Sequence, residues 1–380
     1  MRSTAPLTPH TLPAPAVSSL VSTKRALGRR SCDNPCFPRE TVGVFPVPNI
    51  VPRPSCSIRA LVLVVISLVV AAPVLAAGAH GSAPVDPAAL QALDCDRLDG
   101  TEASVALAGL PAPRIVLLHG SVPIVNMEPF ARFLIGMGYP QDSLRDPADG
   151  SLTQSSFGDS AALAGALAWY YEHDGLRPML IGHSQGGMLV MRTLHELAGA
   201  FATDVAVVDP ATRKALPRTT IRDPYTGSER PVVGLSVSFS SAIATGKLAR
   251  VLLGQWTMLE KLRRVPDSTA EFTGFAIAWD PIAGNGAEAE PYVATGGARV
   301  RNVLLPSRYS HIGAPITEHL PEQDATRAYV IAWRPDSDAP ALPEGIDVRN
   351  LELAADLWYS VRHHWCSEGQ RRLRAGAPAR

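Results

Sequence analysis

The sequence predicts an α/β fold with a doubly wound, mostly parallel sheet. Short continuous apolar runs recur along the chain, and such runs are typical of strands buried on both faces of a parallel sheet. Segments with apolar residues at helical spacing follow the first two runs, and short turns join them. Alternation of this kind favours one layered α/β domain, which we place at residues 80–380.

The first strand-helix unit begins at residues 114–118. This apolar run follows a proline and ends at a His-Gly pair. Residues 130–137 then show a helical pattern that stops at a Gly-Tyr-Pro sequence, because glycine and proline interrupt helices. Residues 80–110 lack a clear period and are expected to wrap the surface.

A second unit repeats the arrangement. Residues 157–172 are rich in alanine and place Leu163, Leu167 and Tyr170 on one helical stripe, which ends at an Asp-Gly pair. The strand and helix expected next are residues 177–181 and 188–197.

Three later strands and a long helix complete the predicted domain, at residues 232–240, 272–279, 300–305 and 350–366. Apolar residues recur every fourth position in the last helix. Residues 203–230 are polar and are expected to form a surface excursion. Residues 248–262 are amphipathic and predict either a helical lid or a core helix; these alternatives stay open.

The composition excludes some classes of function. The formal net charge is zero, so no long-range field favours nucleic acid. With 46% hydrophobic residues, the chain can bury a sizeable core and is not globally disordered.

The N-terminal part differs from the rest. Residues 1–58 are rich in Pro, Ser and Arg and are interpreted as disordered or as mistranslated upstream sequence. Residues 59–79 contain an apolar stretch followed by small residues, a pattern typical of a signal peptide. We therefore expect an exported, periplasmic or secreted protein, with translation beginning near Val51.

An uncleaved anchor is the alternative. The uncharged stretch 60–79 is about long enough to span a bilayer. It would then attach the protein to a membrane.

Cysteine usage fits export. Of five cysteines, only Cys95 and Cys366 lie in the predicted domain, one near each end. They predict a single disulfide, with two unpaired buried thiols as the alternative. Neither cysteine has metal-ligand spacing, so no metal site is expected.

The chemistry centres on the sequence GHSQG, residues 182–186. A buried strand leads into it and a helix leads out, which predicts a sharp turn that raises the hydroxyl of Ser184 above the sheet edge. The glycines on either side leave room for close approach of strand and helix. The helix N-terminus favours a developing negative charge. Ser184 is therefore the predicted nucleophile, and an ordinary turn serine is the alternative.

At this point the chain resembles the α/β-hydrolase family, particularly secreted bacterial lipase- and esterase-like members. The resemblance covers residues 112–366. It rests on the His-Gly pair after the strand VLL, on GHSQGG, and on an acid and a histidine after later strands in the order Ser, Asp, His.

The resemblance implies a base after the last strand and an acid after the strand before it. His311 lies in a loop just after residues 300–305, and Asp280 lies where a buried strand meets a proline. Asp280 would orient the imidazole of His311 and stabilise its charged form.

Rival groups fit less well. Asp209, Asp223 and Asp267 lie in polar segments and are expected in turns. His319 lies in a polar stretch. Of the other candidate histidines, His363 and His364 are expected to be solvated. His183 is expected to pack within the elbow, and His119 to brace the loop after the first strand.

The family's H-G-x loops imply an oxyanion hole built from two backbone N–H groups. Gln185, the residue after the nucleophile, supplies one. Ser121, which follows the His-Gly pair, supplies the other. Each donor of this kind is typically worth about 3 kcal/mol of barrier.

These residues together predict an exported serine hydrolase that cleaves small-molecule or lipid carboxylic esters through an acyl-enzyme. No cofactor or nucleic-acid partner is expected. Acyl transfer and thioester or amide hydrolysis remain open, because one triad serves all of them. A non-catalytic envelope binding protein is the alternative from another class.

Overall fold

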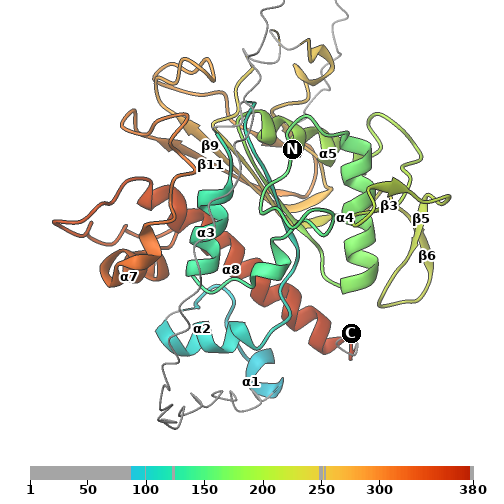
Figure 1. Ribbon diagram of the computed structural model, residues 1–380, viewed down its shortest axis with the longest axis horizontal. Helices are drawn as coiled ribbons and strands as arrows, with labels where there is room; N and C mark the ends of the chain where they lie inside the picture. Colours follow the sequence, from blue (N-terminus) through green and yellow to red (C-terminus); the bar gives the residue numbers. More distant parts are fainter. Residues whose placement is uncertain (1–86, 99, 122–124, 248–250, 252–253, 377–380) are drawn as a thin grey trace, which may run out of the picture. The chain divides into compact units, whose positions relative to one another are not determined.

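The computed structural model describes residues 87–98, 100–121, 125–247, 251 and 254–376, and its centre is a parallel sheet (Figure 1). Five strands lie in the order β1-β2-β7-β9-β11, which is also their order in the sequence. Every neighbouring pair is parallel. The strands are β1 (Ile115–Leu118), β2 (Met179–His183), β7 (Val237–Ile243), β9 (Thr269–Ile277) and β11 (Arg299–Leu305).

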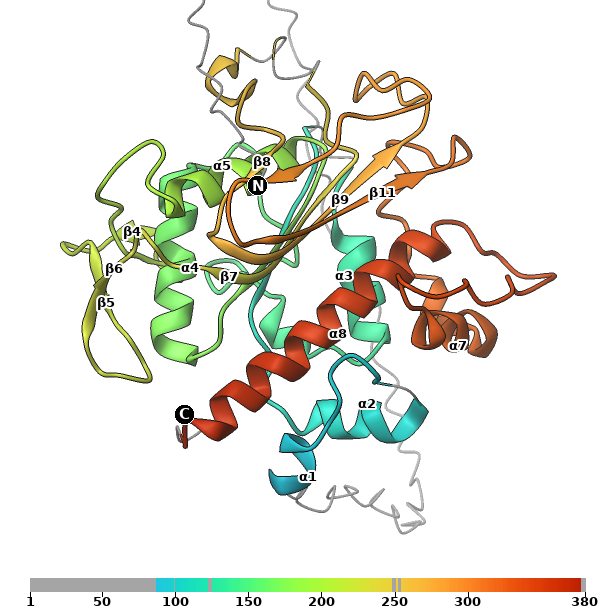
Figure 2. The ribbon, with the colours of Figure 1, turned by 180° about the vertical axis from the view of Figure 1, so that it is seen from behind.

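Helices cover both faces of this sheet (Figures 1 and 2). In β1, Ile115 and Leu117 join one buried cluster, whereas Val116 and Leu118 join the other, because successive side chains of a strand point to opposite faces. The first cluster contains residues of α3 (Glu128–Gly136), α7 (Asp324–Ala332) and α8 (Leu351–Arg374). The second contains residues of α4 (Ser160–Asp174) and α5 (Gln185–Leu197). The predicted α/β class with a parallel sheet is confirmed, and the arrangement is compatible with a doubly wound fold.

The remaining described elements are short and lie outside the central sheet. Two antiparallel hairpins form the expected surface excursion. They consist of β3 (Val208–Asp209), β4 (Lys214–Ala215), β5 (Thr220–Arg222) and β6 (Glu229–Pro231). The others are α1 (Pro87–Gln91), α2 (Gly100–Ala108), η1 (Gln141–Ser143), η2 (Trp256–Met258), β8 (Arg264–Val265), β10 (Val293–Ala294) and η3 (Leu320–Glu322).

The third strand begins later than predicted. The expected strand at residues 232–240 is β7, which starts at Val237 and runs to Ile243. Gly234 has a φ of 92°, a left-handed conformation that does not continue a strand. The serines of β7 enter the core because their hydroxyls are bonded: Ser240 donates to Thr269 Oγ1 at 2.9 Å, and Ser241 donates to the Thr273 carbonyl at 2.8 Å.

The amphipathic segment does not form the predicted long helix where it is described. Residues 248–250 and 252–253 lie outside the described residues. From residue 254 onward there is only the short helix η2, followed by turns. Met258 and Leu262 are fully buried in the second cluster. These two side chains therefore pack in the core, whereas Trp256 is 61% exposed.

The N-terminal predictions lie outside the described residues. This applies to the upstream segment 1–58 and to the apolar stretch 59–79. Within the described part of the chain, none of the helices combines the length and the apolar character needed to cross a membrane.

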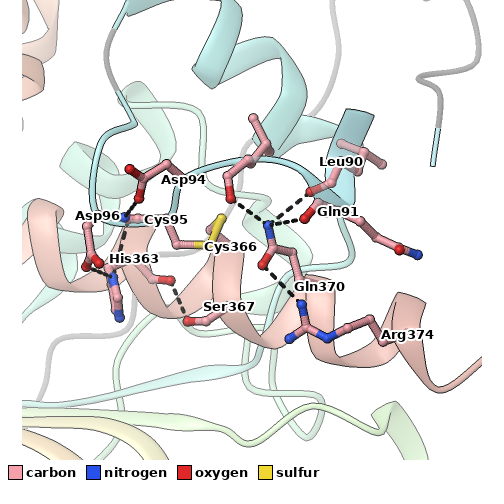
Figure 3. The surroundings of a disulfide bond; sticks show 11 residues. Leu90, Gln91, Asp94, Cys95, Asp96, His363, Cys366, Ser367, Gln370 and Arg374 are labelled. Carbon is pink, nitrogen blue, oxygen red and sulfur yellow. Dashed lines mark hydrogen bonds and ion pairs between the residues drawn. A yellow bond between two sulfur atoms is a disulfide. The ribbon is translucent and has the colours of Figure 1, made fainter. Parts of the chain in front are cut away.

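A disulfide joins Cys95 to Cys366, which lie 271 residues apart (Figure 3). Cys95 follows α1, and Cys366 lies on α8. Next to the bond, the Gln370 side chain donates to the carbonyls of Leu90 and Leu93 at 3.1 and 2.8 Å, where α1 ends. The disulfide and these bonds attach the segment before the sheet to the last helix.

Removing this disulfide should destabilise the fold. A covalent link between distant residues restricts the unfolded chain, so Cys95→Ser with Cys366→Ser should lower the free energy of unfolding by about 2–4 kcal/mol. Urea unfolding of the double variant and the wild type measures the difference. Wild type treated with a thiol reductant should fall to the stability of the variant, and equal stability of all three samples would contradict the prediction.

Candidate active site

Ser184, Asp280 and His311 meet at one edge of the central sheet. They follow β2, β9 and β11, and parallel strands end at the same edge. Nε2 of His311 lies 3.0 Å from Oγ of Ser184, and Nδ1 of His311 lies 2.7 Å from Oδ2 of Asp280. The three side chains named from the sequence therefore form one hydrogen-bonded chain, with the geometry of a nucleophile, a base and an acid.

Ser184 lies in a strained turn between β2 and α5. Its φ is 54° and its ψ is −112°, a conformation that costs free energy in a residue with a Cβ. The end of β7 holds this turn, because Ser184 N–H donates to the Ile243 carbonyl at 2.8 Å and Thr245 Oγ1 donates to the Ser184 carbonyl at 2.9 Å. The serine is thus fixed where the strand ends and the helix begins.

The glycines of the elbow permit this close packing. A Cβ on Gly182 would collide with the backbone of Gly186. A Cβ on Gly186 would collide with the carbonyl of Leu118 at the end of β1. The predicted reason for glycine at both positions is confirmed.

Asp280 is buried and uses its two oxygens differently. Oδ1 accepts the backbone N–H groups of Ile282 and Ala283 at 3.0 and 3.1 Å, whereas Oδ2 faces His311. Burial raises the pKa of Asp280, but the hydrogen bonds from His311 and Ala283 outweigh it, so the pKa lies below its usual range. The carboxylate is therefore ionised at neutral pH.

The hydrogen bonds define the tautomer of His311. An ionised Asp280 can only accept, so Nδ1 of His311 carries the proton and donates to it. Nε2 then has a lone pair that accepts from the Ser184 hydroxyl. Only 8% of the His311 side chain is exposed, which limits competition from water for both bonds.

The loop after β1 brings the first proposed oxyanion donor to the same edge. The carbonyl of Gly120 accepts from Ser156 Oγ at 3.2 Å and lies 2.7 Å from Nδ1 of His119. In a trans peptide the C=O and the following N–H point in opposite directions. Anchoring Gly120 therefore directs the N–H of Ser121 away from Ser156. The expectation that His119 braces this loop is confirmed.

Gln185 is in the position expected of the second donor. It is the first residue of α5 and directly follows Ser184. The N–H groups of a first helical turn point out of the helix N-terminus, where the helix dipole favours negative charge.

Sequence reasoning expected His183 to pack within the elbow but missed its contact with the His311 loop, and it missed Ser156 altogether. Ser156, which anchors Gly120, belongs to a polar stretch without a motif. His183 is fully buried, and its Nε2 lies 2.8 Å from the carbonyl of His311. No local signal marks either contact, because the partners are 36 and 128 residues away.

The rival residues lie elsewhere. The three aspartates accept backbone N–H groups of turns or loops, as expected for Asp209, Asp223 and Asp267. His319 lies 3.7 Å from Asp347. The prediction that His363 and His364 are solvated is wrong for His364, which is buried against Phe239 of β7 and lies 3.5 Å from Glu271. The His363 side chain is only 16% exposed, and its Nδ1 lies 3.0 Å from Asp96.

Apolar side chains surround the acid and the base. A cavity of about 220 Å³ is lined by Asp280 and His311, but not by Ser184, together with Trp279, Ile282 and Ile312. These three apolar residues are 67%, 49% and 49% exposed. A larger cavity, about 350 Å³, lies along α4 and is not lined by any of the three triad residues.

Burial keeps His183 neutral and should make stability fall in acid. Burial and the nearby His311 lower the pKa of His183 to about 3. An unfolded histidine gains its proton near pH 6.5, so this contribution is complete above pH 6.5 and decreases as the pH falls towards 3. The expected slope is about 1.4 kcal/mol per pH unit.

Urea unfolding at pH 7 and pH 5 measures this slope. The variant His183→Gln has no titrating ring at this position and should lose less stability between the two pH values than the wild type. Equal losses in both proteins would contradict the assignment. The buried His364, whose pKa is also lowered, contributes equally to both proteins and cancels.

In the part of the chain that the structure describes, there is no group of three or more His, Cys, Asp or Glu side chains placed to hold a metal ion.

Comparisons with protein-family models, with curated proteins and with solved structures found no match.

Proposed function

We propose that this chain is a serine hydrolase that cleaves carboxylic esters. One observation carries the proposal: Ser184, His311 and Asp280 are joined by hydrogen bonds of 3.0 and 2.7 Å at a strained turn between a strand and a helix. An unactivated serine is a weak nucleophile, and a base oriented by a carboxylate is the usual way to activate it.

The mechanism follows from the protonation states. His311 accepts the proton of Ser184 through Nε2 while Oγ attacks the ester carbonyl. The N–H groups of Ser121 and Gln185 stabilise the oxyanion, and Asp280 stabilises the charged imidazole. His311 then protonates the leaving alcohol, and water hydrolyses the acyl-enzyme in the same manner.

The fold and the chain order support the α/β-hydrolase assignment. The nucleophile follows the second strand of the central sheet, and the acid and base follow the last two, in the order Ser, Asp, His. The exposed apolar residues beside the site, Trp279, Ile282 and Ile312, favour an ester with an apolar group. The disulfide is typical of exported proteins and supports export.

Hydrolysis of p-nitrophenyl esters from acetate to palmitate tests the proposal. We expect turnover by the full chain, with an optimum at one acyl length. A fluorophosphonate probe should label Ser184 and block turnover. Absence of both labelling and turnover in the folded protein would refute the proposal, whereas labelling without turnover would favour acyl transfer or amide cleavage.

A further inference from the structure

His183 connects two loops of the active site. It is the last residue of β2 and directly precedes Ser184. Its Nε2 lies 2.8 Å from the backbone carbonyl of His311, and the two imidazole rings are 5.1 Å apart in an edge arrangement. The residue therefore bonds the backbone of the base rather than its ring.

The direction of this hydrogen bond is fixed by chemistry. A carbonyl can only accept, so Nε2 of His183 must carry a proton and donate it. A neutral imidazole has one N–H, so Nδ1 of His183 has a lone pair. Among the described residues Nδ1 has no hydrogen-bond partner. The low pKa of His183 agrees with this neutral form.

The other side of the ring faces the loop that holds the proposed oxyanion donor. A Cβ on Gly120 would lie 3.3 Å from Nδ1 of His183 and 3.3 Å from a methyl group of Val125. Any residue other than glycine would push against the ring. His183 is thus packed between the backbone of Gly120 and the backbone of His311.

We propose that His183 is a positioning residue that holds the base loop and the oxyanion loop in register with Ser184. The nucleophile and this ring belong to consecutive residues of one rigid turn, so a bond from the ring to the His311 carbonyl fixes the base relative to the nucleophile. His311 otherwise lies in a loop six residues beyond the end of β11. This inference rests on the proposed hydrolase function.

Four variants test the role. His183→Leu removes the hydrogen-bond donor and keeps a bulky side chain in the buried position. It should lower kcat by about 100-fold while KM changes less than about twofold, since small misplacements of reacting groups have effects of this size. His183→Gln keeps an N–H donor at similar reach and should restore kcat to within about fivefold of wild type. His183→Asn carries the same amide on a shorter side chain, so it should lose activity like the leucine variant.

His195→Leu is the matched control. His195 is also buried and also lies within hydrogen-bond distance of a backbone carbonyl through Nε2, at 3.0 Å, but its partner is Lys261, away from the triad. The His195→Leu protein should therefore be less stable than the wild type but keep the wild-type kcat. Active-site titration with the fluorophosphonate normalises each kcat to folded protein.

The outcomes separate the positioning role of His183 from the proposed hydrolase function. Wild-type kcat in His183→Leu, equal losses in His183→Leu and His195→Leu, or equal activity of the Gln and Asn variants would each overturn the positioning role while leaving the hydrolase intact. If wild type itself neither turns over esters nor reacts with the probe, the proposed function fails. If His183→Leu does not fold, the Gln and Asn pair still decides, because the two amides differ only in reach.

Discussion

Replacing Ser184 by alanine should abolish ester hydrolysis. The hydroxyl is the only part of the residue removed, and it is the group that His311 Nε2 contacts at 3.0 Å. Without it no acyl-enzyme forms, and kcat should fall by a factor on the order of 10⁶, as expected when a triad serine is lost. Initial rates on the best p-nitrophenyl ester, with protein in excess, measure the residual activity.

The fold should survive this change. The turn is held by the backbone of Ser184 and by Thr245, and neither bond uses the serine hydroxyl. A matched control is Ser228→Ala, a serine in the β5–β6 hairpin, which should keep full activity. If a Ser184→Ala preparation free of contaminating esterase hydrolysed the ester at a rate close to that of the wild type, the nucleophile assignment would be refuted.

Replacing Asp280 by asparagine should have the second largest effect. Oδ1 of the new amide can still accept the N–H groups of Ile282 and Ala283, so the turn is preserved. The amide nitrogen takes the place of Oδ2, and a donor there cannot accept from Nδ1 of His311. The imidazole then favours the tautomer with its proton towards Ser184, which cannot act as a base. The loss in kcat should be about 10⁴-fold.

Kinetics on the ester ladder check this result, with thermal unfolding as the measure of fold integrity. The variant should melt close to the wild type. An Asp280→Asn protein with more than about a tenth of wild-type kcat would show that another group orients His311.

The site could be predicted because most of its parts carry a local signal in the sequence. Gly182 is required by its close contact with Gly186 in the same turn, whereas Gly186 is required by the distant carbonyl of Leu118 at the end of β1. Asp280 and His311 each follow an apolar run that is visible as a strand. Parallel pairing then places the ends of these strands together without any further information.

Features that depend on distant partners could not be predicted. The sequence predicts that the last helix ends at residue 366, yet α8 continues to Arg374 through residues that look like a polar tail. Glu368 is buried there because Arg177, two residues before β2, pairs with it at 2.7 Å. The two residues are 191 positions apart, so the sequence near Glu368 carries no sign of its partner.

The third strand shows a second reason why parts of the fold could not be predicted from the sequence. Serines stand at alternating and adjacent positions of β7, and the predicted strand 232–240 ends among them, one residue before Ser241. Bonds to Thr269 and Thr273 on the neighbouring strand satisfy those hydroxyls. Polar residues are buried without penalty when such partners exist, and the partners come from pairing that only the fold provides.

The order of the strands has a consequence for how the protein folds during its synthesis. Each strand of the central sheet lies beside the one that precedes it in the chain, so a growing polypeptide can add them one at a time as the ribosome delivers them. Ser184 arrives with the second strand, whereas His311 follows the fifth. We therefore expect the nascent chain to carry its serine through most of synthesis without the histidine that would activate it.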